Sequence, residues 1–452
     1  MSTQLEHILT PDFLEILKKG QSFFQSFDYF RILVHYDGDG TSSAIILTRL
    51  MQRYNKKFHL GFIRELSEDG FSKRYLEERS IPTIFVDCGS DQLRFLPEDT
   101  SNVMVLDHHF YSTSPEWAIN INARDYNIDG TREACGATMA FIFAAFIDDK
   151  NAEDLLPFMI SGCISDKQDM GGFRGVNKKL IEVYGKNIEK KRGLNLHGES
   201  VRDSIVFSLD PFFKDLSGSN NSVNTLLNDL GIDGDKKLNA LTGEETRRLG
   251  LYLSYKLASQ GCQSEAMSYL ETDEYYFENG FASNELSLII DANGKNGENA
   301  TPVEYFLGNN SLKNALIENK KIYQTRLIDY VMRSYKSMEI EKNLQFFYAP
   351  GSEMAGAISG ILMLYLADQT RPIIGFNAGE TFTLISSRGT RKMVEKGLNL
   401  SKVMKECTAE VGGSGGGHDI AAGGSIPRGT ERQFIEIADK MIGKQLEDIE
   451  KY

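Results

Sequence analysis

The chain has 452 residues, of which 41% are apolar and 25% are charged, and its net charge is −13. This length predicts two or three domains, and the composition is that of an ordinary globular protein rather than a disordered chain. The negative charge excludes non-specific coating of duplex DNA, so any binding of nucleic acid requires a local basic surface.

Short apolar runs alternate with helical patterns over the first 180 residues. We predict strands at 31–37, 58–63, 83–89, 103–109 and 117–122, and helices at 41–54, from about 70, at 134–146 and at 154–165. Strands of this kind that alternate with helices indicate a mainly parallel sheet with both faces covered. The predicted fold class is therefore α/β.

The rest of the chain divides into a less regular middle and a second α/β unit. A polar stretch at 184–200 suggests a boundary, and helical patterns follow at 242–260 and 311–335. From about residue 343, strand and helix patterns return, and a glycine run at 412–418 precedes a final amphipathic helix. We predict a first domain at 1–185, a linker with an inserted subdomain at 186–340, and a smaller α/β domain at 341–452.

Three further features narrow the class of protein. No run of about 18 apolar residues predicts a membrane span. The first residues lack the charged and then apolar pattern of a secretory signal, so we expect a cytoplasmic protein that does not bind membranes. The five cysteines are scattered and form no CxxC pair, which argues against a disulfide scaffold and against a cysteine-rich zinc site.

Acidic and histidine residues stand at the ends of three predicted strands in the first domain. They are His35, Asp37 and Asp39 after the first strand, Asp87 after the third, Asp107, His108 and His109 after the fourth, and Asp166 after the helix at 154–165. Because the carboxyl ends of parallel strands line one crevice, we expect these side chains to meet there. Alternation in an extended segment is expected to put the first three on one side.

This combination of ligands predicts a site for two metal ions. A lone Asp at a strand end is usually a helix cap or turn residue, but that interpretation does not account for four such groups in one sheet. Carboxylates packed together repel one another unless cations neutralise them. Oxygen ligands with one or two imidazoles suit Mn²⁺, or Mg²⁺ as the alternative, better than zinc, and two such ions hydrolyse phosphate esters. His35 is either a ligand or a residue behind the ligands.

Four segments resemble, in order, the four motifs of the DHH phosphoesterase superfamily: HYDGDGTSSA (35–44), VDCG (86–89), VLDHH (105–109) and SGCISD (161–166). The resemblance implies that Asp37 and Asp39 each bind one metal ion and that Asp87 bridges the two. It also implies that His108 and Asp166 complete the shell of the second ion.

The same resemblance implies roles around the substrate. His109 would face the scissile phosphate or its leaving oxygen, and Asp107 would orient the histidines from behind. VGGSGGGHDIAAGGSI (411–426) resembles the signature of the associated C-terminal domain, in which Gly416, Gly417 and His418 would bind substrate phosphate. A flexible turn is the plain alternative, but glycines followed by a helix-like apolar stretch favour a loop that approaches phosphate.

The middle of the chain indicates the branch of the superfamily. Residues 291–295, Asp-Ala-Asn-Gly-Lys, resemble in degraded form the Asn-Ala-x-Gly-Arg segment of RecJ nucleases. A plain Asn-Gly turn is the alternative; otherwise Lys295 would contact the strand backbone. The insertion and the SLDPF segment (208–212) look most like archaeal RecJ-like proteins. Relatives of that group associate with the GINS replication complex, so GINS is the expected protein partner.

A basic edge follows one strand of the second domain. Ser387 and Arg388 end the strand, and Arg391, Lys392, Lys396, Lys402 and Lys405 come after it. A solvated charged face is the plain interpretation. We favour a nucleic-acid groove, because an acidic protein needs a local positive surface facing its metal site. Arg388 is the expected phosphate contact, because a guanidinium can bind phosphate through two hydrogen bonds.

We therefore predict a metal-dependent exonuclease on single-stranded DNA, RNA or both, acting in DNA replication or repair. One alternative is a phosphodiesterase for short oligonucleotides or cyclic dinucleotides, and another is a replication-complex accessory with a scaffold role. Pyrophosphatases of the superfamily carry a histidine four residues before the first metal-binding Asp. This chain has Leu33 there, which counts against that activity.

Overall fold

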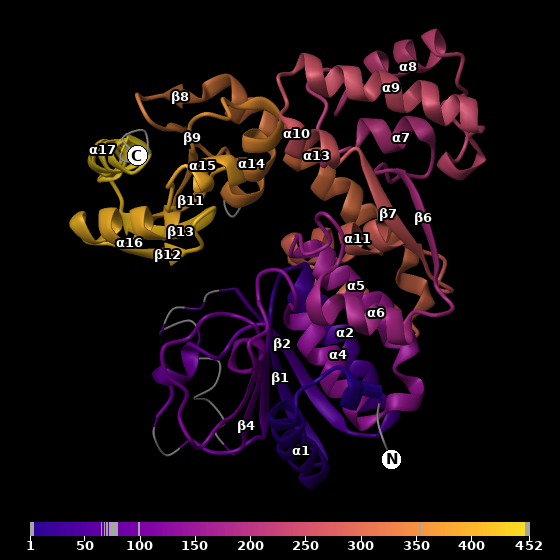
Figure 1. Cartoon of the computed structure of the whole chain (residues 1–452), viewed down its shortest axis with the longest axis vertical. Coiled ribbons are helices and arrows are strands. Elements are labelled where there is room, and N and C mark those ends of the chain that lie inside the picture. The colour runs from indigo at the N-terminus through magenta and orange to yellow at the C-terminus, as the bar shows by residue number, and fades with distance from the viewer. Residues whose placement is uncertain are drawn as a thin grey trace. The chain divides into compact units, whose positions relative to one another are not determined.

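A computed structural model describes residues 4–64, 66, 68, 71, 80–97, 100–351 and 354–447. The chain forms two compact units, Met1–Arg192 with Asp273–Tyr323, and Gly193–Thr272 with Gln324–Tyr452 (Figure 1). This division differs from the segments predicted at 1–185, 186–340 and 341–452. The middle of the chain is shared between the units, and its 273–323 portion packs with the first unit.

The first unit is built on a five-stranded parallel sheet with the strand order β2-β1-β3-β4-β5. Its strands are β1 (Tyr29–His35), β2 (Lys57–Ile63), β3 (Thr83–Val86), β4 (Val103–Asp107) and β5 (Ile119–Asn122). The parallel sheet confirms the predicted α/β class. The predicted helix from about residue 70 falls mainly outside the described residues.

The central strands β1, β3 and β4 are buried on both faces, which explains why their residues are mainly apolar. Ile32 and Val34 of β1 point into the main core, whereas Leu33 of β1 and Val105 of β4 belong to a smaller cluster on the opposite face. The main core lies under a layer of helices that run beside the sheet in Figure 1: α1 (Pro11–Ser26), α2 (Gly38–Arg53), α4 (Gly136–Ile147) and α5 (Leu156–Ser165). α6 (Gly175–Tyr184) follows them in the chain.

Two helices from the middle of the chain add to this layer, α11 (Ser283–Lys295) and α12 (Ala300–Phe306). Ser287 of α11 donates through Oγ to the carbonyl of Ser161, at 2.8 Å. Residues 291–295 are the last turns of α11, so the plain Asn-Gly turn considered for them is wrong. Asn293 is fully buried there and donates to the carbonyls of Ile289 and Leu316. These bonds keep the segment helical.

The strands β6 (Glu189–Leu194) and β7 (Glu271–Tyr276) form a separate two-stranded sheet, and the long helix α13 (Lys313–Ser337) includes residues of both units. The second unit begins with four helices: α7 (Val201–Val206), α8 (Asn220–Asp229), α9 (Gly243–Ser259) and α10 (Ser264–Ser268). The region between the two predicted α/β domains is thus mainly helical.

A six-stranded mixed sheet with the order β12-β13-β11-β10-β9-β8 forms the rest of the second unit. Its strands are β8 (Glu339–Ile340), β9 (Gln345–Tyr348), β10 (Ile373–Ala378), β11 (Phe382–Arg388), β12 (Ser414–Gly417) and β13 (Ala421–Pro427). β9 and β10 pair in parallel, and the other pairs are antiparallel. The accompanying helices are α14 (Ala355–Ile361), α15 (Arg391–Glu395), α16 (Leu400–Glu410) and α17 (Glu431–Glu447).

The glycine run forms a strand and a second strand follows it, where a loop and a helix-like stretch were predicted. β12 contains most of the run and pairs with β13 along its length. Its lack of side chains lets α16 pack closely. A Cβ atom on Gly415 would lie 3.0 Å from the carbonyl oxygens of both Met404 and Gly423. Small residues are needed here for packing, which sequence periodicity did not reveal.

Among the described residues, no helix has the length and apolar character required to cross a lipid bilayer.

Candidate metal centre

The predicted ligands gather at the carboxyl end of the parallel sheet. Three sets of side chains have ligand atoms within 4.8 Å of one another: His35, Asp37 and Asp87; Asp39, His108 and Asp166; and Asp87, Asp107, His108 and His109. They come from the ends of β1, β3 and β4, the start of α2 and the end of α5. The structure therefore brings together every residue predicted for the metal site.

The first motif reaches the site by a different route from the one predicted. β1 ends at His35 and α2 begins at Gly38, so Asp37 is a helix cap that accepts from the Gly40 amide at 3.0 Å. Asp39 lies in the first turn of α2. The predicted alternation along an extended segment is wrong, because Asp37 satisfies an amide at the helix start and ends the strand early. Asp37 and Asp39 consequently join different groups of ligands.

Asp39 is held by the amino terminus of α4. Its carboxylate is fully buried and accepts from the amides of Gly136, at 2.6 Å, and Ala137, at 2.8 Å. These amides have no partner within the helix, and the helix dipole favours a negative charge beside them. A Cβ atom on Gly136 would lie 2.5 Å from Cβ of Asp87, so glycine is required there. Sequence reasoning missed this contribution.

Asp87 faces both groups of ligands. Its Oδ1 lies 3.2 Å from Nε2 of His108, and its Oδ2 lies 3.5 Å from Nδ1 of His35. The backbone of Asp87 has φ of +56°, in the left-handed region that most residues avoid. Such strain is maintained where the surrounding structure fixes a side chain at a functional site. Asp87 therefore lies between the two groups of ligands, and its bridging of two ions stays a prediction from the resemblance.

His108 is oriented so that one ring nitrogen is available as a ligand. Its Nδ1 is 2.5 Å from the carbonyl oxygen of Gly130 and donates to it. Nε2 then faces the carboxylates of Asp87, Asp166, at 3.6 Å, and Asp39, at 3.8 Å. A hydrogen bond from one imidazole nitrogen to a carbonyl fixes the tautomer and leaves the other nitrogen free to bind metal.

Asp107 supports the two histidines. Its Oδ1 accepts from the amide of His108, at 2.8 Å, and from Nδ1 of His109, at 2.8 Å, while Oδ2 accepts from the Ser90 amide, at 3.1 Å. Burial raises the pKa of Asp107, but the histidines and the Ser90 amide outweigh it and hold that pKa well below its usual range. The carboxylate stays ionised and leaves Nε2 of His109 available to a substrate.

The electrostatics of the centre fit bound cations. Burial, Asp87 and Asp166 raise the pKa of Asp39 well above its usual value, and burial is the main cause that raises the pKa of Asp166 to about 7. Burial lowers the pKa values of His35 and His108, but neighbouring carboxylates outweigh it and raise both. Without cations, the site therefore binds protons, and these supply the positive charge that metal ions would otherwise supply. Carboxylate oxygens with imidazoles suit Mn²⁺ or Mg²⁺.

α11 contributes an ion pair beside the first motif. Asp291 accepts from the Gly38 amide through Oδ1, at 3.1 Å, and its Oδ2 lies 2.6 Å from Nζ of Lys295. Burial raises the pKa of Asp37. His35, the Gly40 amide and Lys295 outweigh this effect and hold that pKa well below its usual value. The structure therefore places Lys295 at the centre, but in an ion pair. Asp291 was not predicted as a site residue.

The predicted substrate residues of β11 lie on opposite faces of that strand. Ser387 is fully buried, and its hydroxyl donates to the carbonyl of Ala422 at 2.9 Å. Its predicted role in substrate binding is therefore corrected to one of holding β13. Arg388 lies on the other face, where its guanidinium approaches Gly356. The error arose because successive residues of a strand point in opposite directions.

Arg388 is a half-buried cation without an acidic neighbour. Its guanidinium donates to the carbonyl of Ser387 at 2.8 Å, and among residues 4–447 that the structure describes no carboxylate lies within ion-pair distance. Burial alone lowers its pKa. Removing a charge from water without a counter-ion is unfavourable, so this guanidinium is suited to an anion from outside the chain.

Gly416, Gly417 and His418 lie where β12 turns into β13. The amide of His418 donates to the carbonyl of Ala421 at 2.8 Å, and Gly417 has φ of +138°, which favours glycine. The side chain of His418 is exposed. The structure thus places the predicted phosphate-binding residues together in a hairpin rather than in a free loop.

The basic edge after β11 is partly neutralised. Nε of Arg391 lies 3.6 Å from Oε1 of Glu265, and Nζ of Lys402 lies 3.9 Å from Oε1 of Glu406. Exposed pairs of this kind contribute little to stability. Part of the edge is therefore the solvated face that we considered as the plain interpretation.

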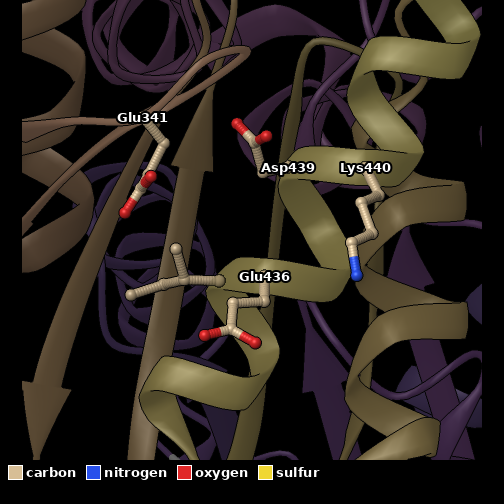
Figure 2. Close-up of a pocket in the computed structure, with 5 residues that line it drawn as sticks. Glu341, Glu436, Asp439 and Lys440 are labelled. Carbon is tan, nitrogen blue, oxygen red and sulfur yellow. The ribbon is translucent and has the colours of Figure 1, made fainter.

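Figure 2 shows a hollow in the second unit that is not the candidate site. It is lined by Glu341, Ile435, Glu436, Asp439 and Lys440. Asp439 accepts from the amide of Asn343 at 2.7 Å, and Glu341 pairs with Arg432 at 2.8 Å. These acids are used to hold α17 against the start of the sheet, and none of the predicted site residues lies there.

Two family models match the chain, "DHH family, N-terminal domain" at residues 30–163 and "DHHA1 domain" at residues 343–444. The chain is 29% identical over 441 residues to the uncharacterized protein MJ0831 of Methanocaldococcus jannaschii, a match that covers 94% of this chain and 96% of that protein.

Two solved structures share the fold. RecJ in complex with Mn²⁺ from Thermus thermophilus has a TM-score of 0.59 and 14% identity, over 96% of this chain and 55% of that one. CDC45 from Entamoeba histolytica has a TM-score of 0.63 and 11% identity, over 96% of this chain and 99% of that one. This chain therefore spans about half the length of that RecJ, and at such identities the similarity concerns the fold.

Proposed function

We propose that this chain, which belongs to the DHH/DHHA1 phosphoesterase superfamily, is a two-metal exonuclease that hydrolyses single-stranded DNA, RNA or both. The observation that carries the proposal is the buried centre in which Asp87 faces two groups of ligands. One group contains His35 and Asp37, and the other contains Asp39, His108 and Asp166. Mn²⁺ is the expected metal, with Mg²⁺ as the alternative.

Two divalent cations, when bound, activate water and neutralise charge on the reacting phosphate. The chain's own residues do the rest. The carboxylates and His108 would hold the cations in place, and Asp107 fixes the ring of His109 through Nδ1. When both ring nitrogens carry a proton, Nε2 of His109 is the group that donates a hydrogen bond or a proton to the phosphate or to its leaving oxygen.

A nucleic-acid substrate is supported by the second unit. Arg388 offers a partly desolvated guanidinium with no acidic partner among the described residues, and the hairpin that contains His418 offers an exposed imidazole. Both are suited to the phosphates of a strand. The complete set of metal ligands argues against an accessory protein whose nuclease is lost. Association with GINS, and a role in replication or repair, remain predictions from the resemblance.

Arg388→Ala is expected to raise KM for a single strand by roughly 10- to 100-fold, because a hydrogen-bonded contact to a charged group contributes about 1.5–3 kcal/mol. Steady-state kinetics on an end-labelled strand measures this. Arg333→Ala is the matched control, since the Arg333 side chain is 61% exposed and already pairs with Asp329 on the same helix. Wild-type KM in Arg388→Ala would show that this guanidinium does not bind substrate.

The proposed activity is tested with single strands of DNA and RNA of about 20 residues, each end labelled in turn, with Mn²⁺ or Mg²⁺. We expect mononucleotides to be released from one end, and duplexes to be cleaved slowly. A dinucleotide is compared in the same assay. If the dinucleotide is preferred by orders of magnitude, the chain is a phosphodiesterase for short oligonucleotides instead. Absence of metal-dependent cleavage in all substrates would refute both activities.

A further inference from the structure

An exposed aromatic ring lies directly beside the metal centre. Phe110 follows His109 in the chain, and 68% of its surface is accessible to solvent. The side chain of His109 is itself 47% exposed and packs against the ring of His108. A ring that buries so little surface gains little from the hydrophobic effect, so core packing does not account for an aromatic residue at this position.

Arg124 fixes the position of that ring. The central carbon of its guanidinium lies 3.4 Å from the centroid of the Phe110 ring, and its Nε donates to the carbonyl of His108 at 2.9 Å. The hydroxyl of Tyr111, the next residue, donates to the carboxylate of Asp125. One face of the Phe110 ring is therefore covered by a planar cation, while much of the remaining ring surface is open to solvent.

The guanidinium has hydrogen-bond donors to spare. Among the residues described, only its Nε has a protein acceptor. The carboxylates of Asp129 and Asp107 act on Arg124 electrostatically, but neither forms an ion pair with it in that part of the chain. Arg124 is half-buried and is attached to the backbone of the metal-binding histidine. A held guanidinium with unused donors suits a phosphate, and an open aromatic face suits a nucleobase.

We infer that Phe110 and Arg124 form a nucleotide-binding site beside the metal centre, in which the open face of Phe110 stacks on a nucleobase and Arg124 binds an adjoining phosphate. This inference rests on the proposed nuclease function and adds that the enzyme recognises a nucleobase together with its adjoining phosphate. Every base has a π face, so stacking holds a strand without selecting its sequence. The site requires a substrate that carries bases, and not merely a phosphodiester.

The test compares two single strands of about 20 residues, one normal and one in which every base is missing and the sugar is tetrahydrofuran. We expect the wild-type kcat/KM to be about tenfold higher for the normal strand than for the strand without bases. A ratio of this size is what the stacking of one base on one aromatic ring contributes. Phe110→Leu should bring this ratio close to one, and Phe110→Tyr should retain it. Tyr29→Leu is the matched control, because Tyr29 is 41% exposed but lies at the opposite end of β1.

The ratio separates stacking from a structural role. If Phe110 only supports Arg124 or the backbone, Phe110→Leu lowers cleavage of both strands alike and keeps the wild-type ratio, which overturns the inference. Equal cleavage of the two strands by the wild-type chain also overturns it, while leaving the proposed nuclease intact. A wild-type chain that cleaves neither strand with Mn²⁺ overturns both the nuclease and the stacking site.

Discussion

Asp166→Asn is expected to reduce Mn²⁺-dependent hydrolysis by about a thousandfold or more, and at the same time to stabilise the metal-free protein. Loss of a cation's ligand removes several kcal/mol of stabilisation from the reacting phosphate, and about 1.4 kcal/mol corresponds to a factor of ten in rate. Nε2 of His108 lies 3.6 Å from the Asp166 carboxylate, so the substitution acts at the predicted second ion.

The gain in stability follows from the negative charge of the ligand carboxylates in the metal-free protein. Burial, together with Asp87 and Asp37, raises the pKa of Asp166 to about 7 although the histidines oppose this. Its unfolded value is about 3.9, so ionisation costs stability in the folded state. The protonated acid makes its full contribution to the free energy of unfolding below about pH 4, and this contribution is lost as the pH rises towards 7. Asparagine does not ionise and avoids this loss.

Thermal unfolding at about pH 8, with and without Mn²⁺, measures the stability and the response to the metal, and the initial rate of Mn²⁺-dependent hydrolysis measures the activity. Wild type should unfold at a higher temperature when Mn²⁺ is added, whereas Asp166→Asn should start higher and respond little to the metal. Glu182→Gln is the control, because this acid on α6 is 61% exposed and should change neither stability nor rate. Retention of full activity in Asp166→Asn would remove Asp166 from the metal site.

His109→Ala is expected to lower kcat by roughly 10²- to 10⁴-fold without weakening the binding of Mn²⁺. The Nδ1 atom of His109 is occupied by Asp107, at 2.8 Å, and this leaves Nε2 to act on the phosphate. His109 is also among the clustered potential ligands with Asp87, Asp107 and His108, so its role needs to be separated from metal binding.

Calorimetric titration of Mn²⁺ into wild type, His109→Ala and Asp166→Asn makes that separation. If His109 acts on the substrate, His109→Ala binds metal as wild type does, and only Asp166→Asn binds it weakly. A loss of Mn²⁺ affinity in His109→Ala as large as that in Asp166→Asn would make His109 a metal ligand. Asp107→Asn should resemble His109→Ala in kcat, because an amide does not orient the imidazole in the same tautomer.

The parallel sheet and the ligand set could be predicted because both depend on local sequence. Runs such as 32–34 and 103–106 are apolar on both faces of the strand, which indicates a sheet covered on both sides. Carboxyl ends of parallel strands meet at one edge, so Asp87 and the histidine pair could be placed together without a structure. The helix cap at Asp37 was also visible as an Asp-Gly-Asp-Gly segment before a helix, but it was interpreted as an extended strand.

Other features depend on contacts that no local pattern reveals. Asp291 accepts from the amide of Gly38, which is 253 positions away in the chain. The amides that hold Asp39 belong to Gly136 and Ala137, ordinary small residues at the start of a helix. Ser387 is on the buried face of β11, although the neighbouring arginine suggested that both contact substrate. Such assignments need the three-dimensional packing of elements distant in sequence.

The central claim is that the buried carboxylates and histidines of the first unit bind two divalent cations. Anomalous diffraction at the manganese absorption edge, from crystals of the full chain grown with Mn²⁺, tests it most directly. We predict two anomalous peaks, one among His35, Asp37 and Asp87, and one among Asp39, His108 and Asp166, with Asp87 in contact with both. Manganese bound elsewhere, or no peak at the carboxyl end of the parallel sheet, would contradict the account.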